Sequence, residues 1–304
     1  MATTVASPEL RNYERKVRGT GVMGTILAFF RRLARNKGAL IAGIVLLCLV
    51  LISINAIGSR LAPYDPTKMA AGPQLAPPST ANWFGTDQFG RDILSRVIYG
   101  GRLTLGTSLF GVVLAAIVGT TAGLAAGYLA GWIDFAIMRM VDVMLAFPGL
   151  LLTLAIVAVL GPGQQNIQIA LGVSLIPGFV RLVRGAVLAT KSNDYIEAAT
   201  TIGCHPLRVM FRHILPNIMT PIVVLFTTAI GWAIIIASSL SFLGLGVNPP
   251  AAEWGSDMKQ ALSYLSQGWW MAFPGAAIMV AILAVNLFGD GLQEALDPYT
   301  KRKV

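Results

Sequence analysis

The sequence predicts an all-α protein that crosses a membrane several times. Of its 304 residues, 55% are hydrophobic and only 12% are charged, and the mean hydropathy is +0.68. Several uncharged stretches are longer than the roughly 20 apolar residues that a helix needs to cross the hydrocarbon core of a bilayer. Soluble proteins of this length do not have this composition, so we expect a polytopic membrane protein.

Six membrane-spanning helices are expected, with errors of a few residues at each end. They lie near residues 39–58, 103–130, 143–160, 167–188, 217–243 and 271–289. The third and fourth spans are separated by Gly161-Pro162-Gly163-Gln164-Gln165-Asn166. We expect a tight turn there, because glycine and proline end helices and the amide side chains favour water.

The chain divides around these spans into two tails, an external segment and a core. The expected parts are a basic cytoplasmic tail at 1–38, the first span at 39–58, an external segment at 59–102, a five-helix transmembrane core at 103–293 with a cytoplasmic loop at 189–216, and a cytoplasmic tail at 294–304. Ile93, Leu94, Val97 and Ile98 share one face, which predicts an interfacial helix at the end of the external segment. Most of the 23 Lys and Arg residues fall inside if both termini are cytoplasmic, as the positive-inside rule requires.

Four glycines recur every four residues in and just after the second span, namely Gly119, Gly123, Gly127 and Gly131. This spacing places them on one stripe of a helix, where the absence of side chains lets another helix approach closely. We expect the stripe to be a helix-packing surface. A substrate-lining stripe is the alternative, and it is the rarer use of small residues in membranes.

Several kinds of chemistry are not expected of this chain. The apolar stretches hold essentially no charged residue, so a proton relay has no groups to use. His205 and His213 are eight residues apart and could not share a metal without help from elsewhere, so we expect no metal site. No phosphate-binding Gly-x-x-x-x-Gly-Lys-Ser/Thr is present, so any ATP must be bound by another subunit. The basic charges collect beside the spans, and nucleic acid is not an expected partner.

The most informative segment is the polar, basic loop at 189–216, which lies between two long apolar runs and is longer than a simple connection needs. Asp194 precedes Glu197 by three residues, which predicts a helix that starts at Asp194 with these side chains as a capping box. Gly203 suits a left-handed helix end, and Pro206 suits the first turn of a second helix. We therefore expect a compact helix–turn–helix on the cytoplasmic side.

The spacing of Glu197-Ala198-Ala199, Gly203 and Leu215-Pro216 resembles the EAA motif of bacterial ABC-importer permeases. That family commonly has isoleucine two residues before Leu-Pro, where this chain has His213. Other segments resemble the C-type permease of dipeptide, oligopeptide and nickel importers. They are Leu61-Ala62-Pro63-Tyr64-Asp65-Pro66, Phe84-Gly85-Thr86-Asp87-Gln88-Phe89-Gly90-Arg91-Asp92, Phe211-Arg212-His213-Ile214-Leu215-Pro216-Asn217, Ser241-Phe242-Leu243-Gly244-Leu245-Gly246 and Leu296-Asp297-Pro298.

This resemblance implies a type I ABC-importer permease, which forms half of a translocation pore in a bacterial or archaeal cytoplasmic membrane and is not an enzyme. The implied partners are a B-type permease, two ATP-binding subunits that carry ATP and Mg, an external substrate-binding protein and the lipid bilayer. The implied cargo is a peptide. The alternatives are nickel or a metal chelate and, more remotely, an ion-coupled secondary transporter.

The resemblance also implies roles for particular residues. Coupling to the ATPase subunit would use Asp194, Glu197, Ala198, Ala199, Gly203, His205 and Pro206. Leu215 and Pro216 would form a hinge at the start of the fifth span. The external segments at 59–102 and 244–270 would meet the binding protein or gate the outer mouth.

Overall fold

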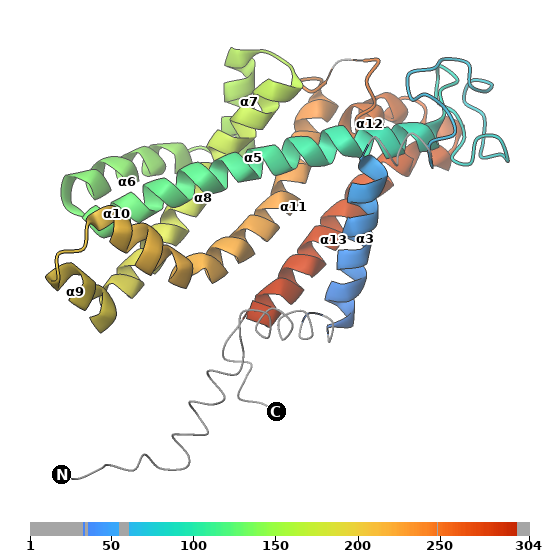
Figure 1. The fold of residues 1–304 in the computed structure, drawn as a ribbon. Coiled ribbons are helices and arrows are strands. Elements are labelled where there is room, and N and C mark those ends of the chain that lie inside the picture. The colour runs from blue at the N-terminus through green and yellow to red at the C-terminus, as the bar shows by residue number, and fades with distance from the viewer. Residues whose placement is uncertain (1–32, 34–35, 55–60, 248, 297–304) are drawn as a thin grey trace, which may run out of the picture.

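The computed structural model describes residues 33, 36–54, 61–247 and 249–296 (Figure 1). The predictions for residues 1–32, for the end of the first span beyond Ile54 and for residues 297–304 lie outside the described residues. Within the described part all regular elements are helical, apart from one isolated bridge between Thr86 and Asp92, and this confirms the all-α prediction. The helices are α3 (Lys37–Ser53), α5 (Ile93–Leu129), α6 (Gly131–Leu145), α7 (Gly149–Leu160), α8 (Gln164–Lys191), α9 (Asp194–Thr201), α10 (Pro206–Arg208), α11 (Met219–Leu243), α12 (Trp254–Leu262) and α13 (Phe273–Leu296), with π or 3-10 turns at Val209–Ile214, Leu215–Ile218, Leu265–Gln267 and Trp269–Ala272.

Four helical stretches of the described residues are long and apolar enough to cross a membrane. They are Ile93–Leu129, Gln164–Lys191, Pro206–Leu243 and Trp269–Leu296. The α6–α7 pair is a fifth candidate if its two bent halves count as one span. Helix α3 is apolar but has only 17 described residues, which span about 26 Å at 1.5 Å per residue.

Helix α5 is longer than the predicted second span. It begins at Ile93 and has 37 residues, so it is about 55 Å long at 1.5 Å per residue. The helix predicted at the end of the external segment is therefore present, and it continues without a break into the second span. The carboxylate of Asp92 accepts a hydrogen bond from the backbone N–H of Ser95 and starts the helix, and neither proline nor a polar turn interrupts it before Leu129.

The predicted third span, 143–160, is not a straight helix. The chain bends by 92° between α6 and α7, at Ala146, Phe147 and Pro148. Proline has no N–H to continue the backbone ladder and its ring clashes with the preceding turn, so α7 starts afresh after Pro148. The predicted turn after α7 is shorter than expected, because Gly161 and Gly163 adopt positive φ and α8 already begins at Gln164.

Helices α5 and α8 form the most extensive helix–helix contact of the described fold. A Cβ added to Gly123 would lie 2.7 Å from Cβ of Val183, and one added to Gly127 would lie 2.7 Å from Cβ of Val187. Gly119 abuts Phe179 in the same way. These three glycines therefore let the two backbones meet closely.

Gly131 does not extend this stripe, which corrects the prediction. Helix α5 ends at Leu129, and Gly131 has a φ of +57° at the start of α6 with no atom within 4 Å of an added Cβ. The change of direction at Ala130 takes Gly131 out of the helical register on which the prediction depended.

The long helices run between the two ends of the molecule (Figure 1). The N-terminal end of α5 lies beside α12 and the segment before it, whereas its C-terminal end lies beside α6, α9 and α10. Helices α3 and α13 pack side by side, and α11 lies between α13 and the α5–α8 pair. Any site at one end of the molecule is therefore connected to the other by continuous helices.

Candidate functional site

The loop expected to couple the chain to a partner forms a helix–turn–helix, which we call the coupling knob (residues 194–208). Its first helix, α9, begins at Asp194 as predicted. The predicted capping box is not formed, because the N-cap residue is Asn193 and no side chain bonds the free N–H groups. Asp194 and Glu197 instead lie in the first turn, where negative charge favours the positive end of the helix dipole.

The end of α9 has the geometry of a Schellman motif. Gly203 has a φ of +81°, its N–H donates to the carbonyl of Thr200 at 3.0 Å, and the N–H of Cys204 donates to the carbonyl of Ala199 at 3.1 Å. Pro206 then opens α10, and the His205 side chain accepts a hydrogen bond from the N–H of Leu207 at 3.3 Å. The glycine and proline therefore stand where the turn needs them.

The predicted start of the fifth span at 217 lies close to Met219, where the regular helix α11 begins. Helix already runs from Pro206 through Leu215 and Pro216 to Leu243, so no break separates the knob from this span. The helix is irregular there, with a π-turn at Val209–Ile214 and a 3-10 turn at Leu215–Ile218. Pro216 provides no N–H for the backbone ladder, which accounts for a local change in winding rather than a break.

The knob presents an apolar outer face that the sequence analysis missed. Glu197 and Ala198 are exposed, but the flanking Tyr195 is 45% exposed and Ile202 is 80% exposed. Leu207 and Phe211 are also exposed. Helical spacing alone could have shown that Tyr195, Ala198 and Ile202 share one face.

One predicted coupling residue, Ala199, faces inward and is only 7% exposed. Ala199 and Ile196 are the two buried residues of α9. Ala199 therefore supports the knob from within and has little surface to offer a partner. Asp194, Gly203, His205 and Pro206 are exposed.

The knob is rooted in the transmembrane helices through a buried apolar cluster. Ile196 of α9 is 1% exposed and lies in one cluster with residues of five other elements. These are Leu124 of α5, Val183 and Val187 of α8, Val209, Met210, Ile214 and Ile218 of the π and 3-10 turns, and Ile222 of α11. Lys191, at the end of α8, donates to the carbonyl of Tyr128 at 2.7 Å. Ile196 therefore joins α9 to the same packed cluster as residues of α5, α8 and α11.

A second polar region lies at the opposite end of α5, and we call it the outer cap (residues 61–92, the first three turns of α5 and residues 249–262). Its local framework comes from the segment Phe84-Gly85-Thr86-Asp87-Gln88-Phe89-Gly90-Arg91-Asp92. The Asp87 carboxylate accepts hydrogen bonds from the N–H groups of Phe89 and Arg91 and from Arg91 Nε at 2.6 Å. Gly90 has a φ of +69° and lies against the carbonyl of Gly72, so a side chain there would clash.

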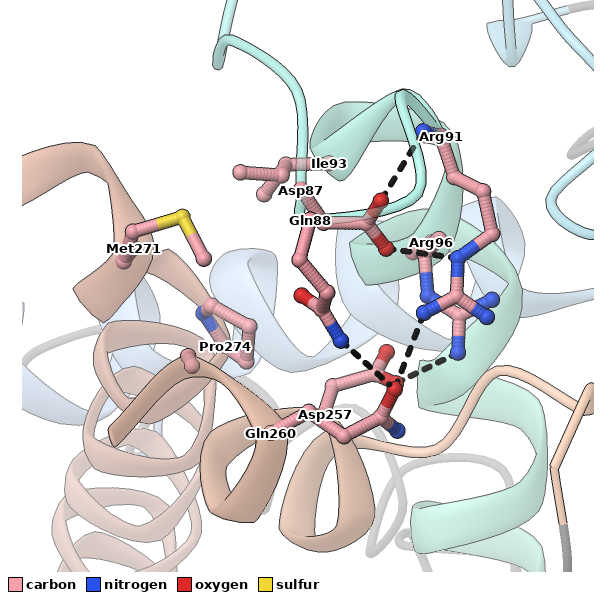
Figure 2. Close-up of a pocket in the computed structure, with 10 residues that line it drawn as sticks. Asp87, Gln88, Arg91, Ile93, Arg96, Asp257, Gln260, Met271 and Pro274 are labelled. Carbon is pink, nitrogen blue, oxygen red and sulfur yellow. Dashed lines mark hydrogen bonds and ion pairs between the residues drawn. The ribbon is translucent and has the colours of Figure 1, made fainter. Parts of the chain in front are cut away.

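Arg96 is the residue that joins the parts of the outer cap. It is 3% exposed, and its Nη1 donates to the carbonyl oxygens of Pro66 at 2.8 Å and Pro250 at 3.2 Å. Its Nη2 donates to the carbonyl of Ala251 and pairs with the Asp257 carboxylate (Figure 2). One guanidinium therefore connects the external segment, α5 and α12.

Two amide side chains add a second connection (Figure 2). Gln88 Nε2 and Arg91 Nη2 both donate to Oε1 of Gln260, at 3.1 and 3.0 Å. The buried Glu253 caps α12 through the N–H groups of Gly255 and Ser256. The segments at 61–92 and 249–262 therefore fold together as one unit, which sequence periodicity does not show.

Burial raises the pKa of Asp257 to about 6, although the Arg96 and Arg91 charges oppose the shift. Only Oδ1 of Asp257 pairs with Arg96, whereas Oδ2 is buried without a partner. The nearby Glu253 carboxylate also raises the pKa. Asp257 is therefore a carboxyl group that titrates near neutral pH at the centre of the outer cap.

Acidification is expected to stabilise the outer cap through Asp257. The folded pKa lies above the ordinary value of 3.8, so the stabilising contribution is complete below about pH 4 and is lost as the pH rises through about 6. Between about pH 8 and about pH 5, the melting temperature of the wild type should rise relative to that of Asp257→Asn, which cannot titrate. A difference between the two proteins that stays constant, or falls, over this range contradicts the prediction.

Among the residues that the structure describes, no group of three or more His, Cys, Asp or Glu side chains could hold a metal ion. A polytopic helical protein with an exposed helix–turn–helix at one end and a folded polar cap at the other suits a membrane permease. Sequence comparison then identifies the family. The chain matches the family described as binding-protein-dependent transport system inner membrane component over residues 119–302, and it belongs to that family.

The N-terminal part matches the N-terminal transmembrane domain of oligopeptide transport permease C over residues 27–78. The resemblance to C-type importer permeases is therefore confirmed. The chain is a transport permease of the inner membrane and not an enzyme. In such systems ATP is bound by separate ATPase subunits, and the permease works with a partner permease and a binding protein.

Characterised relatives align along nearly their whole length. The glutathione transport system permease protein GsiD of Pectobacterium atrosepticum is 46% identical, over 90% of this chain and 91% of that protein. The dipeptide transport system permease protein DppC of Alkalihalophilus pseudofirmus is 44% identical, over 90% and 89%. The di/tripeptide transport system permease protein DppC of Pseudomonas aeruginosa is 43% identical, over 90% and 92%.

A solved structure of the MetNI methionine ABC transporter, in an inward-facing conformation, has a similar fold. The TM-score is 0.55, and the match covers 66% of this chain and 96% of that chain at 16% sequence identity. At this level of identity the likeness concerns the fold alone.

Proposed function

We propose that this chain forms one half of the translocation pore of an ATP-driven peptide importer. The other half would be a B-type permease, with two ATP-binding subunits on the inner side and a substrate-binding protein on the outer side. The observation that carries the proposal is the coupling knob, whose exposed face is free for a partner while its buried face is joined to α5, α8 and α11. That arrangement would pass a movement of the partner to the membrane helices.

The proposed substrate is a small peptide. Relatives that are 43–46% identical over 90% of the chain are named for dipeptides, di/tripeptides and glutathione, which is itself a tripeptide. Nickel or a metal chelate was the alternative from sequence. The described residues hold no metal-binding cluster, but a chelate would not require one, so uptake assays with each substrate must separate the two.

The proposed topology has six spans with both termini in the cytoplasm. It counts α3, α5, the bent α6–α7 pair, α8, the helix from Pro206 to Leu243, and the helix from Trp269 to Leu296. An even number of spans places the coupling knob on the cytoplasmic side and the outer cap on the other, in agreement with the charge distribution. Leu215 and Pro216 would act as a flexible point within a continuous helix, since the π and 3-10 turns there replace regular winding.

Glu197→Arg is expected to uncouple the complex. The side chain is exposed and forms no ion pair or hydrogen bond with the described residues, so the reversed charge should cost folding only the favourable dipole interaction in the first turn of α9, about 0.3–1 kcal/mol. Opposite a surface that accepts a carboxylate, it should weaken binding of the ATPase subunit at least roughly tenfold, or about 1.4 kcal/mol. Co-purification and ATP-dependent dipeptide uptake in proteoliposomes measure the two effects.

Gly203→Asp tests the same site with a matched control. Gly203 and Gly131 both have positive φ, at +81° and +57°, and both have open space where a Cβ would be added. Aspartate should therefore strain the two backbones similarly, but only Gly203 lies in the coupling knob. We expect Gly203→Asp to abolish uptake and Gly131→Asp to retain it. Full uptake by Gly203→Asp, in protein that inserts normally, contradicts the coupling role.

A further inference from the structure

A cavity of about 420 Å³ lies where α11, α12 and α13 meet. Its volume falls within the range of pockets that bind small molecules. The cavity is lined by Ile235, Ser238, Ser239, Phe242 and Leu243 of α11, Gly255 and Met258 of α12, and Ile278 and Ile282 of α13. No charged side chain lines it. The cavity is therefore suited to an uncharged, partly apolar group.

Two adjacent serines supply its polar character. The hydroxyl of Ser239 donates to the carbonyl of Ile235 at 2.7 Å, as helical serines commonly do. The hydroxyl of Ser238 is buried, with the residue 7% exposed, and it has no hydrogen-bond partner in the described structure. A buried hydroxyl without a partner is costly unless a ligand or water completes it. Ser238 belongs to the cavity wall, but its oxygen is covered, so its unused donor and acceptor reach a ligand only when α12 shifts from α11.

The cavity lies directly beneath the outer cap. Gly255 of α12 rests on α11, since a Cβ added to it would lie 2.5 Å from the carbonyl oxygen of Ser238. Two residues further on, Asp257 joins the same helix to Arg96. The outer cap thus holds α12 in place as one wall of the cavity, and release of that contact would change the cavity's shape.

A polar side chain, that of Asn286, lies on α13 next to the cavity. Asn286 lies one helical turn after Ile282 and is exposed, and its side-chain oxygen would be 2.7 Å from a Cβ added to Gly231 of α11. Lipid tails cannot satisfy an amide, so polar side chains in membrane helices face protein or water. Asn286 therefore favours protein or water over lipid at the groove between α11 and α13.

We propose that this cavity is a transit site for peptide, where serine hydroxyls contact the uncharged main chain and the apolar wall accommodates a side chain. The inference rests on the proposed function and adds to it the position and chemistry of a contact site. Main-chain amides have the same donors and acceptors in every peptide, and the absence of charge means that no particular side chain is selected. Choice of substrate would then be made elsewhere.

The test is the reactivity of a cysteine at Ser239. Cys48 and Cys204 are first replaced by serine, and Ser239→Cys is made in that background, with Ile117→Cys on α5 as control, an exposed residue that does not line the cavity. The assembled complex is treated with a charged methanethiosulfonate reagent, which reacts with thiolates in contact with water. Both nucleotide-free and vanadate-trapped complexes are used.

We expect Ser239→Cys to react at least tenfold faster than Ile117→Cys in one of the two states, and the modification to block dipeptide uptake. Lipid or the partner permease would block the reagent if either filled the groove. Failure of the Ser239→Cys thiol to react in both states would therefore overturn the proposal of a transit site. The same outcome follows if modified protein transports normally. ATP-dependent dipeptide uptake before modification tests the proposed function separately. The transit site can therefore fail while the proposed function stands.

Discussion

A protein with methionine in place of Arg96 is expected to lose about 3–5 kcal/mol of stability, because breaking a buried ion pair leaves an uncompensated charge. Asp257 would remain buried without its guanidinium partner. The carbonyl oxygens of Pro66, Pro250 and Ala251 would lose their donor at the same time. Methionine is a long, unbranched side chain, so the loss should reflect charge and hydrogen bonding more than empty space. The outer cap should loosen from α5 as a unit.

The measurement is the melting temperature of the purified complex in detergent. At roughly 2–4 °C for each kcal/mol, the Arg96→Met protein should melt several degrees below the wild type. Arg102→Met is the matched control, since Arg102 lies on the same helix but is exposed. The double variant Arg96→Met/Asp257→Asn should recover part of the loss, because it removes the stranded carboxylate. Equal effects of the two arginine variants would show that Arg96 is not the joint.

Composition and apolar run length were sufficient to predict the all-helical, polytopic fold. The length of apolar run that a span needs is set by the thickness of the bilayer, which is the same for every span. The interruptions within apolar runs were harder to predict. Pro148 bends one span by 92°, whereas Pro177 lies inside an unbroken α8, and Pro216 only changes the winding. The packing around each proline decides among these outcomes, and that packing cannot be read from a single sequence.

The coupling knob was predictable to a large extent, because its signals are local. The start of α9 at Asp194 and the left-handed Gly203 follow from residues within one or two turns. The burial of Ala199 and the exposure of Ile202 depend instead on how α9 sits against α5, α8 and α11. The sequence motif predicts where a partner contacts the chain, and the structure adds which side of the helix is exposed.

The outer cap was the part that sequence analysis could not predict. Arg96 and Asp257 are separated by 161 residues, and neither belongs to a periodic pattern. The paired Gln88 and Gln260 are 172 residues apart. Contacts of this kind leave no trace in local propensity.

Leucine in place of Gly123 is expected to disrupt the contact between α5 and α8 and to lower stability strongly, as Arg96→Met does. Even a Cβ at this position would lie 2.7 Å from Cβ of Val183 and 2.9 Å from the carbonyl oxygen of Val180. The carbonyl belongs to the helix backbone and cannot turn aside, so the two helices must separate. Overpacking of this kind typically costs about 1–3 kcal/mol, and a leucine at a backbone contact should lie at or above the top of that range.

Gly106→Leu is the control, because Gly106 lies on the same helix and an added Cβ has no atom within 4 Å. Both variants gain the same apolar volume and lose the same glycine. The yield of monodisperse complex and its melting temperature should fall for Gly123→Leu and stay near wild type for Gly106→Leu. Since α8 leads directly to the coupling knob, any Gly123→Leu protein that assembles should also import less per ATP hydrolysed. Unchanged melting and unchanged uptake by Gly123→Leu would mean that the glycine stripe does not hold these two helices together.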